Sequence, residues 1–197
     1  MTLRSGVVLS LLLGIFAEPS HAVELVIEYG ALQRIVAQEL FTQEGRKYVR
    51  GNRTARCSFA YLENPRIDAD RGRLRIQARF TGRTAADLFG ACIGLGDAFD
   101  VSITATPYYH DGLIGFRDVS VDSLGRGGFY IRRVRAAMTQ SLSRDFQYHL
   151  FEDVKRTLEQ KITSAPYVQN LKDFQVPRIR ATAKALVLTL EFELVVK

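Results

Sequence analysis

The sequence contains few of the residues that build metal sites and catalytic centres. It has two cysteines and three histidines among 197 residues, and two cysteines with no nearby histidine fall short of a metal-ligand set. His110 lies in a turn signal and His149 inside a predicted helix, positions typical of solvated residues. A nucleophile elbow, a zinc-binding helix motif and a complete glycine fingerprint are also missing. We therefore expect a protein that is not an enzyme and uses no cofactor or metal.

Long hydrophobic runs are missing after residue 22, so the sequence predicts no later membrane span. The N-terminus has the three parts of a signal peptide: Arg4 supplies positive charge, Val7–Phe16 an apolar stretch, and Ser20–Ala22 a small-residue cleavage site. We expect residues 1–22 to be removed and residues 23–197 to form one soluble periplasmic domain. An uncleaved anchor is the alternative. A lipid anchor is not expected, because no cysteine follows the apolar stretch.

The two cysteines, Cys57 and Cys92, form a natural pair in an exported chain. Disulfides persist in oxidising compartments, so a bond between them is expected. On the chain-entropy model, closing a loop of this length stabilises the fold by roughly 4 kcal/mol. Two separate buried thiols are the alternative.

Apolar residues alternate with polar ones over much of the chain, which is typical of half-buried strands. The sequence predicts strands at Val23–Ile27, Arg46–Arg50, several within Ala55–Leu124, Asp173–Thr182 at a sheet edge and Leu186–Val196, with a helix at Tyr29–Phe41. Asp70–Gly72 and His110–Gly112 are hairpin turn signals. A phase slip between Phe116 and Val119 suggests a bulge. Gly90–Gly96 is expected to be a glycine-rich connection.

One long helix is predicted from Tyr130 to about Ile162, since no Gly or Pro interrupts this run before Pro166. Its apolar members fall at every fourth position: Val134, Met138, Leu142, Phe146, Leu150, Val154, Leu158 and Ile162. The helix would be roughly 45 Å long, longer than the globule of about 40 Å expected for this chain. The stripe drifts around the helix, which favours either a sheet that curves around it or a kink. The predicted fold class is α+β, with a curved antiparallel sheet wrapped around one long helix and a short N-terminal helix.

An apolar seam between this helix and the sheet is the candidate ligand site. Its predicted residues are Leu142, Phe146, Leu150, Val154, Phe59, Ile76, Phe80, Ile103 and Phe116. Such a seam suits a hydrophobic ligand, because binding then follows the apolar area removed from water. Ordinary core packing is the alternative. If the helix is broken, the argument for a tunnel along it fails.

Basic residues cluster in two places, and the sequence carries a formal charge of +6. The candidates for contact with an anionic headgroup or a partner are Arg73, Arg75, Arg132, Arg133 and Arg135. Attraction to anionic lipids or to another envelope polyanion is one interpretation, and solvated surface charge is the other. Nucleic acid is not expected, because the chain is predicted to be exported and has no recognition motif.

The predicted helix Tyr29–Phe41, the meander Ala55–Leu124, the helix Tyr130–Ile162 and the strand Leu186–Val196 resemble the tubular lipid-binding (TULIP) superfamily. That superfamily includes bactericidal/permeability-increasing and SMP-type domains, and the likeness is greatest to small periplasmic single-module proteins. The resemblance implies a curved sheet around a long helix, with lipid held in an apolar seam. It supplies no catalytic residues. The chain departs from many single-module relatives in lacking a lipobox cysteine.

The sequence therefore favours an exported, non-enzymatic binding protein for lipid or another hydrophobic ligand. The alternative is a structural or protein-interaction module of the cell envelope with a closed core. A secreted hydrolase inhibitor that uses Gly125–Gly128 as a wedge loop is a third hypothesis. Ligand identity, oligomeric state and any protein partner are beyond the sequence.

Overall fold

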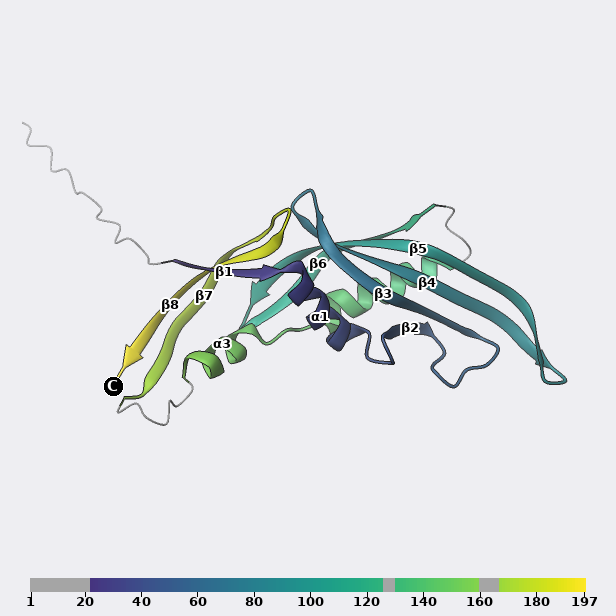
Figure 1. The fold of residues 1–197 in the computed structure, drawn as a ribbon, viewed down its shortest axis with the longest axis horizontal. Helices are drawn as coiled ribbons and strands as arrows, with labels where there is room; N and C mark the ends of the chain where they lie inside the picture. The colour runs from purple at the N-terminus through teal and green to yellow at the C-terminus, as the bar shows by residue number, and fades with distance from the viewer. Residues whose placement is uncertain (1–21, 126–129, 160–166) are drawn as a thin grey trace, which may run out of the picture.

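The computed structural model describes residues 22–125, 130–159 and 167–197. The predicted signal peptide lies outside these residues except for Ala22, as does most of the hypothetical wedge loop. Figure 1 shows an elongated molecule with a small sheet at one end and a larger sheet that extends to the other.

The larger sheet is antiparallel and has five strands in the order β2-β3-β4-β5-β6. They are β2 (Arg46–Arg50), β3 (Phe59–Asp70), β4 (Arg73–Leu88), β5 (Ala91–His110) and β6 (Leu113–Leu124). On β4 the predicted alternation is confirmed, since Leu74, Ile76 and Phe80 are buried while Arg73 and Arg79 are not. One face of this sheet therefore supplies the core.

Both predicted hairpin turns are confirmed. Arg71 and Gly72 have φ values of 51° and 78°, and Asp111 and Gly112 have 48° and 84°. Two successive positive φ angles define the two-residue turn that matches the twist of a hairpin. The predicted bulge is also present, because the register of β5 with β6 shifts opposite Arg117–Ser120.

The smaller sheet is antiparallel, in the order β1-β8-β7. Its strands are β1 (Val23–Glu28), β7 (Gln169–Ala181) and β8 (Ala185–Val196). The central strand β8 buries Leu186, Leu188 and Leu190. β7 lies at an edge, as Pro177 predicted, and approaches β4 and β5 of the larger sheet.

The predicted long helix is wrong, and with it the predicted fold class. The described chain is mostly β-strand and contains only short helices. They are α1 (Tyr29–Leu40), α2 (Ile131–Gln140), a π-helical turn η1 (Ser141–Asp145) and α3 (Leu150–Leu158). The fold is therefore two antiparallel sheets with short covering helices, rather than one sheet around a continuous helix.

The helix breaks where the strand β6 binds its backbone. Phe146 has φ −82° and ψ 114°, an extended conformation, and its N–H donates to the Ser141 carbonyl at 2.8 Å. Two residues later, Tyr148 and Ile114 exchange two backbone hydrogen bonds of 3.0 and 2.9 Å. Local propensity favoured helix throughout, so a long-range contact overrode it.

The fourth-residue stripe still faces the core despite this break. Val134, Met138, Leu142, Phe146 and Leu150 are all buried. The drift of the stripe is therefore accommodated by separate short segments, each aligned locally with the sheet, and Ile162 lies outside the described residues.

The predicted disulfide is confirmed between Cys57 and Cys92, whose Cα atoms are 5.1 Å apart. The expectation of a glycine-rich connection at Gly90–Gly96 is wrong. Only Phe89 and Gly90 form a turn, and β4 and β5 pair from Leu88 with Ala91 inward. The disulfide thus attaches the far part of this hairpin to the chain preceding β3.

Candidate functional site

The residues of the predicted seam lie mostly in a closed interior. Seven of the nine are buried: Leu142, Phe146, Leu150, Ile76, Phe80, Ile103 and Phe116. They belong to one core cluster, against which Val154 packs, whereas Phe59 lies apart and stacks on Tyr61 at 5.8 Å. Aromatic contacts fill this interior, with ring centroids 4.9 Å apart for Phe116 and Phe146. A ligand role for these residues stays a prediction.

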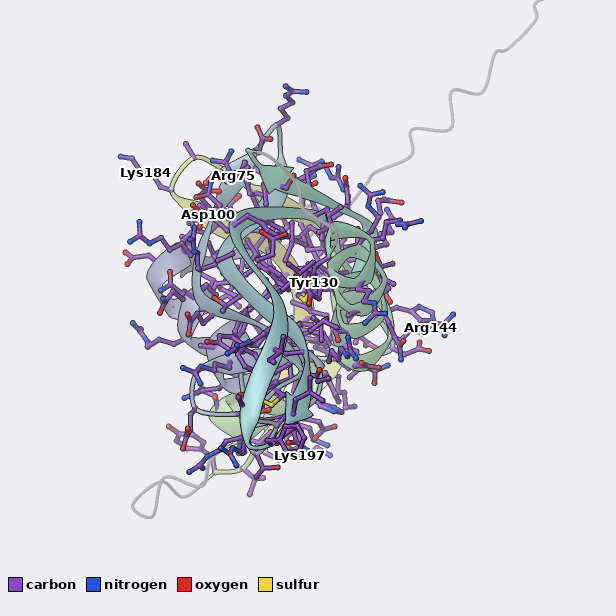
Figure 2. All side chains as sticks on the ribbon, turned by 90° about the vertical axis from the view of Figure 1, so that its right-hand side faces the viewer. Arg75, Asp100, Tyr130, Arg144, Lys184 and Lys197 are labelled. Carbon is purple, nitrogen blue, oxygen red and sulfur yellow. A yellow bond between two sulfur atoms is a disulfide. The ribbon has the colours of Figure 1, made fainter. Side chains whose placement is uncertain are left out.

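The predicted basic residues do not form one patch. Arg75 makes a bidentate pair with Asp68, with both N–O distances at 2.7 Å. Arg73 donates to backbone carbonyls of Thr104 and Asp118. These side chains lie on the face of β4 opposite its buried residues, and Figure 2 shows Arg75 near the top of the view, away from Arg144 at the right.

The helical arginines lie on the other side of the sheet. Arg135 donates to the Val121 carbonyl at 3.2 and 3.3 Å, while Arg132 and Arg133 are exposed. Arg73, Arg75 and Arg135 therefore have structural partners, and any anion contact at Arg132 and Arg133 stays a prediction.

An open cavity of about 470 Å³ lies where α3 and β7 meet the β5–β6 turn. We call it the junction pocket. Its lining residues are Tyr109, Asp111, Gly112, Phe151, Leu171, Asp173 and Phe174. The pocket combines aromatic and aliphatic walls with two carboxylates, which is the usual make-up of a small-molecule site.

Three aromatic rings shape the walls of the junction pocket. The Phe174 and Tyr109 rings meet edge to face, with their centroids 6.0 Å apart. The Phe174 and Phe151 rings are tilted, with their centroids 5.6 Å apart. Behind it, Phe192 of β8 stacks on Phe174 at 6.4 Å. Rings at these separations support one another, so the apolar surface is held in place without a ligand.

The backbone positions each wall of the junction pocket. The N–H of Phe151 donates to the Gly112 carbonyl at 3.0 Å, which joins the start of α3 to the turn. A side chain at Gly112 would place its Cβ only 3.2 Å from the Phe151 Cβ. The small turn residue therefore permits the close approach of α3.

Irregularities in β7 direct Phe174 toward the junction pocket. The register of β7 with β8 shifts twice, between Lys172 and Gln175 and between Gln175 and Arg178. Asp173 lies at the first shift with φ +50°. Bulges of this kind re-aim side chains, and here the re-aimed side chain is an aromatic ring.

The electrostatics of the junction pocket favour neutral or positive groups over negative ones. Burial raises the pKa of Tyr109, and the nearby Asp111 carboxylate adds to this effect. The phenol therefore stays neutral in ordinary conditions. Asp111 and Asp173 bring negative charge to the lining, while the Lys155 ammonium lies 5.8 Å from the centre of the Phe151 ring.

The pKa of a tyrosine beside the pocket is shifted more strongly. Burial, with a hydrogen bond to Asp153 as the second cause, raises the pKa of Tyr148 to about 12. This is the residue whose backbone pairs with Ile114. The shift marks tight packing of the segment before α3 rather than a reactive group.

A second hollow, of about 370 Å³, lies on the outer face of the sheet. It is lined by Asn64, Arg66, Gln77, Ala78, Arg79, Asp100 and Leu124. Arg79 and Asp100 pair across it at 3.1 Å. Its polar surface and internal ion pair make it the weaker candidate for an apolar ligand.

Sequence reasoning missed the junction pocket, although it noted some of its parts. His110–Gly112 was identified only as a turn, and Phe174 only as a strand residue. Phe151 sits beside the fourth-residue stripe rather than in it. Pro177 was the available sequence signal of an irregular edge strand, but nothing in the sequence places α3 against that strand.

Across residues 22–125, 130–159 and 167–197, no group of three His, Cys, Asp or Glu residues is placed to hold a metal ion. No helix in these ranges is long and apolar enough to span a membrane.

Comparisons with protein-family models and with curated proteins found no match. Among solved structures, the chain is similar to the crystal structure of a lipopolysaccharide binding protein, with 12% sequence identity and a TM-score of 0.30. The alignment covers 89% of this chain and 51% of that one, so this chain spans about half its length. A likeness this distant identifies neither a ligand nor a partner of this chain.

Proposed function

We propose that this protein is an exported, non-enzymatic binding protein for a hydrophobic small molecule or lipid, held in the junction pocket. The observation that supports this proposal is the open cavity of about 470 Å³ walled by Tyr109, Phe151 and Phe174. Its volume falls within the range of small-molecule sites. The proposal does not depend on a tunnel along a long helix, since no such helix exists in the described chain.

The charges of the pocket narrow the ligand class. Asp111 and Asp173 would repel a carboxylate or phosphate at the same depth. A ligand with an apolar body and a neutral or cationic polar end fits better, because aromatic faces and carboxylates both attract positive charge. A free fatty acid is therefore a poorer ligand than a neutral lipid.

Binding of the neutral fluorescent probe Nile red tests the pocket. Phe174→Ala should weaken binding by about tenfold, since losing most of an aromatic contact area costs more than 1.4 kcal/mol. Phe59→Ala is the matched control, because Phe59 is a half-buried aromatic residue outside the pocket. Equal binding by both variants and the wild type would exclude the junction pocket.

A second variant tests whether the carboxylates of the junction pocket disfavour anionic ligands. Asp173→Asn keeps a residue that tolerates positive φ and removes one carboxylate. We expect it to improve binding of an anionic fluorescent fatty acid severalfold while leaving Nile red unchanged. An unchanged preference between the two probes would refute the assigned ligand class.

Export is proposed from the N-terminal sequence alone. Expression of the full chain followed by N-terminal sequencing of the periplasmic fraction should give a protein that begins at Val23. An intact N-terminus on the exported protein would reject cleavage of a signal peptide and favour an uncleaved membrane anchor.

The closed packing of the predicted seam favours a second candidate, an interaction module of the cell envelope. Phe80, Ile103 and Leu142 are fully buried in the free chain. This candidate predicts no Nile red binding above background and no lipid in native mass spectra of the purified protein. Recovery of a stoichiometric lipid would reject it.

A further inference from the structure

The far end of the β4–β5 hairpin extends beyond α2 and the rest of the sheet (Figure 1). We call residues 84–95 the hairpin tip. Its large apolar side chains are exposed: Leu88 by 49%, Ile93 by 61%, Leu95 by 82%, and Phe89 completely. Isolated exposed apolar residues are common, but four on one protruding hairpin call for an explanation.

The register shows that three of these side chains continue the core face of the sheet. Phe80 pairs with Phe99 in the buried body, and on the same face Thr84 pairs with Leu95, Ala86 with Ile93 and Leu88 with Ala91. Thr84 contacts the Tyr130 hydroxyl, and this contact marks the end of the cover supplied by Tyr130 and α2. Past this point the apolar face is open.

The turn of the hairpin holds an aromatic residue in an unfavourable conformation. Phe89 and Gly90 have φ values of 54° and 83°, the two-residue turn that favours Asn-Gly. A bulky residue at positive φ is a genuine outlier. Phe89 thus costs stability both by its backbone and by its exposure, and a strained exposed residue suggests a role outside folding.

Three features constrain the hairpin tip. The Cys57–Cys92 disulfide holds its opposite face, and the Asp87 carboxylate accepts the Gly90 N–H at 2.9 Å. A Cβ at Gly94 would lie 2.1 Å from the Thr84 carbonyl oxygen, so the strands approach more closely there than any side chain allows. A rigid tip loses little conformational entropy on binding.

Positive charge lies behind the apolar end. Arg83 donates to the Cys92 carbonyl at 2.7 Å, Arg50 donates to the Thr84 hydroxyl at 3.0 Å, and Arg56 is exposed next to Cys57. Residues 50–57 and 83–97 together contain four arginines and two aspartates, and one of these arginines, Arg53, pairs with Glu44 at 2.6 Å. The four-residue step from Thr84 to Leu88 measures about 13 Å along a strand.

We propose that the hairpin tip docks the protein on an anionic lipid surface, with Leu88, Phe89 and Ile93 inserted and the arginines among the headgroups. Ile93 pairs with Ala86, two residues before Leu88, so the apolar end spans about 7 Å along the strands, within the depth of about 5–10 Å for an interfacial anchor. Asp87 lies on the opposite face, between Ala86 and Leu88. Its carboxylate accepts the Gly90 N–H, so insertion is confined to a depth at which this carboxylate stays among the headgroups. A protein partner fits less well, because two strands about 5 Å apart offer little area for a stable interface.

The chain contains no tryptophan, so Phe89→Trp introduces a single tryptophan, at the tip, whose emission can be excited selectively. With vesicles of phosphatidylcholine and phosphatidylglycerol, its emission should shift to the blue. Tyr167→Trp is the control, since Tyr167 is an exposed aromatic residue on a different segment, and its emission should not move. Absence of a shift at position 89 would overturn the proposal.

Phe89→Asn separates docking from folding, because Asn-Gly suits this turn better than Phe-Gly. Its melting temperature should stay equal or rise, while sedimentation with the same vesicles falls by about tenfold. Arg83→Gln should weaken binding to these vesicles but not to phosphatidylcholine alone. If Phe89→Asn bound vesicles as tightly as the wild type, the proposal would be overturned. It would also be overturned if the wild-type protein self-associated and Phe89→Asn did not.

The proposal is independent of the junction pocket, because the helix α3 and the strand β7 that line this pocket lie far from the hairpin tip in Figure 1. Phe89→Asn should therefore bind Nile red normally, and Phe174→Ala should bind vesicles normally. Failure of one proposal leaves the other measurable.

Discussion

The strands β4 and β5 carry one pattern of side chains through two opposite environments. In the body of the sheet, Phe80 and Val101 are buried in one core with Val134 and Met138 of α2. At the hairpin tip, Leu88 and others on the same face of the same strands are exposed. Alternation therefore states which face is apolar, but not whether another part of the protein covers it.

The largest expected effect comes from the buried half of this comparison. Phe80→Ala should lower the free energy of unfolding by about 3–5 kcal/mol, because it empties a fully buried aromatic position. Leu88→Ala on the same face should change it by less than about 0.5 kcal/mol. Denaturant titration followed by circular dichroism measures both. Comparable losses would show that the tip is covered in solution.

Removal of the disulfide should cause the next largest loss of stability. It tests how the hairpin tip is linked to the rest of the sheet. Replacing both Cys57 and Cys92 by serine should cost about 2–4 kcal/mol, the usual range for a loop of this length. Hydrogen exchange should quicken at the hairpin tip more than in the core of β4. A uniform loss of protection would mean that the tip has no separate stability.

Phe89→Asn is expected to stabilise the protein by about 0.5–1 kcal/mol, because asparagine tolerates the positive φ of this turn. Leu88→Asn is the matched variant. It changes the adjacent residue, at the end of β4, and relieves no positive-φ strain. Thermal unfolding of the two variants compares them directly. A loss of stability in Phe89→Asn would show that the ring makes a favourable contact in the free protein.

A pH-dependent effect is expected at the end of the molecule opposite the tip. The folded pKa of Tyr148, about 12, exceeds its ordinary value of 10.0, so the folded state binds this proton more tightly. The stabilisation is complete below pH 10 and is lost as the pH rises from 10 to about 12. As the pH is raised, α3 should therefore lose its protection from hydrogen exchange before the hairpin tip does.

Tyr148→Phe is the control for that pH dependence, since it removes the ionising hydroxyl and keeps the ring. Ultraviolet titration of phenolate absorbance should lose one late-titrating tyrosine in this variant. An unchanged late phase would assign the shifted pKa to another residue.

Local patterns predicted the strands, both two-residue turns, the bulge after Phe116 and the disulfide. Each of these depends on neighbouring residues or on a single cysteine pair. The long helix failed for the opposite reason: residues 146–149 have no helix-breaking signal, and their conformation depends on the bridge from Tyr148 to Ile114. Helical propensity is weak enough for such a contact to decide.

The candidate sites were less accessible to prediction than the strands. The junction pocket needs Phe151 and Phe174, which are distant in sequence and meet only because α3 docks on the β5–β6 turn. The hairpin tip was hidden by its glycines, which resemble a loop. Gly94 is in fact a strand residue, required by the close approach of Thr84.

The sequence by itself determined most of the strands, which of their faces are apolar and which cysteines pair, because these depend on periodicity and covalent chemistry. The tertiary structure alone decided that the helical run breaks and that Phe151 and Phe174 enclose a pocket. It also decided that the apolar face of β4 and β5 is covered at Phe80 and open at Leu88. The physical reason is that burial and backbone pairing depend on segments far apart in the chain, whose approach no local pattern encodes.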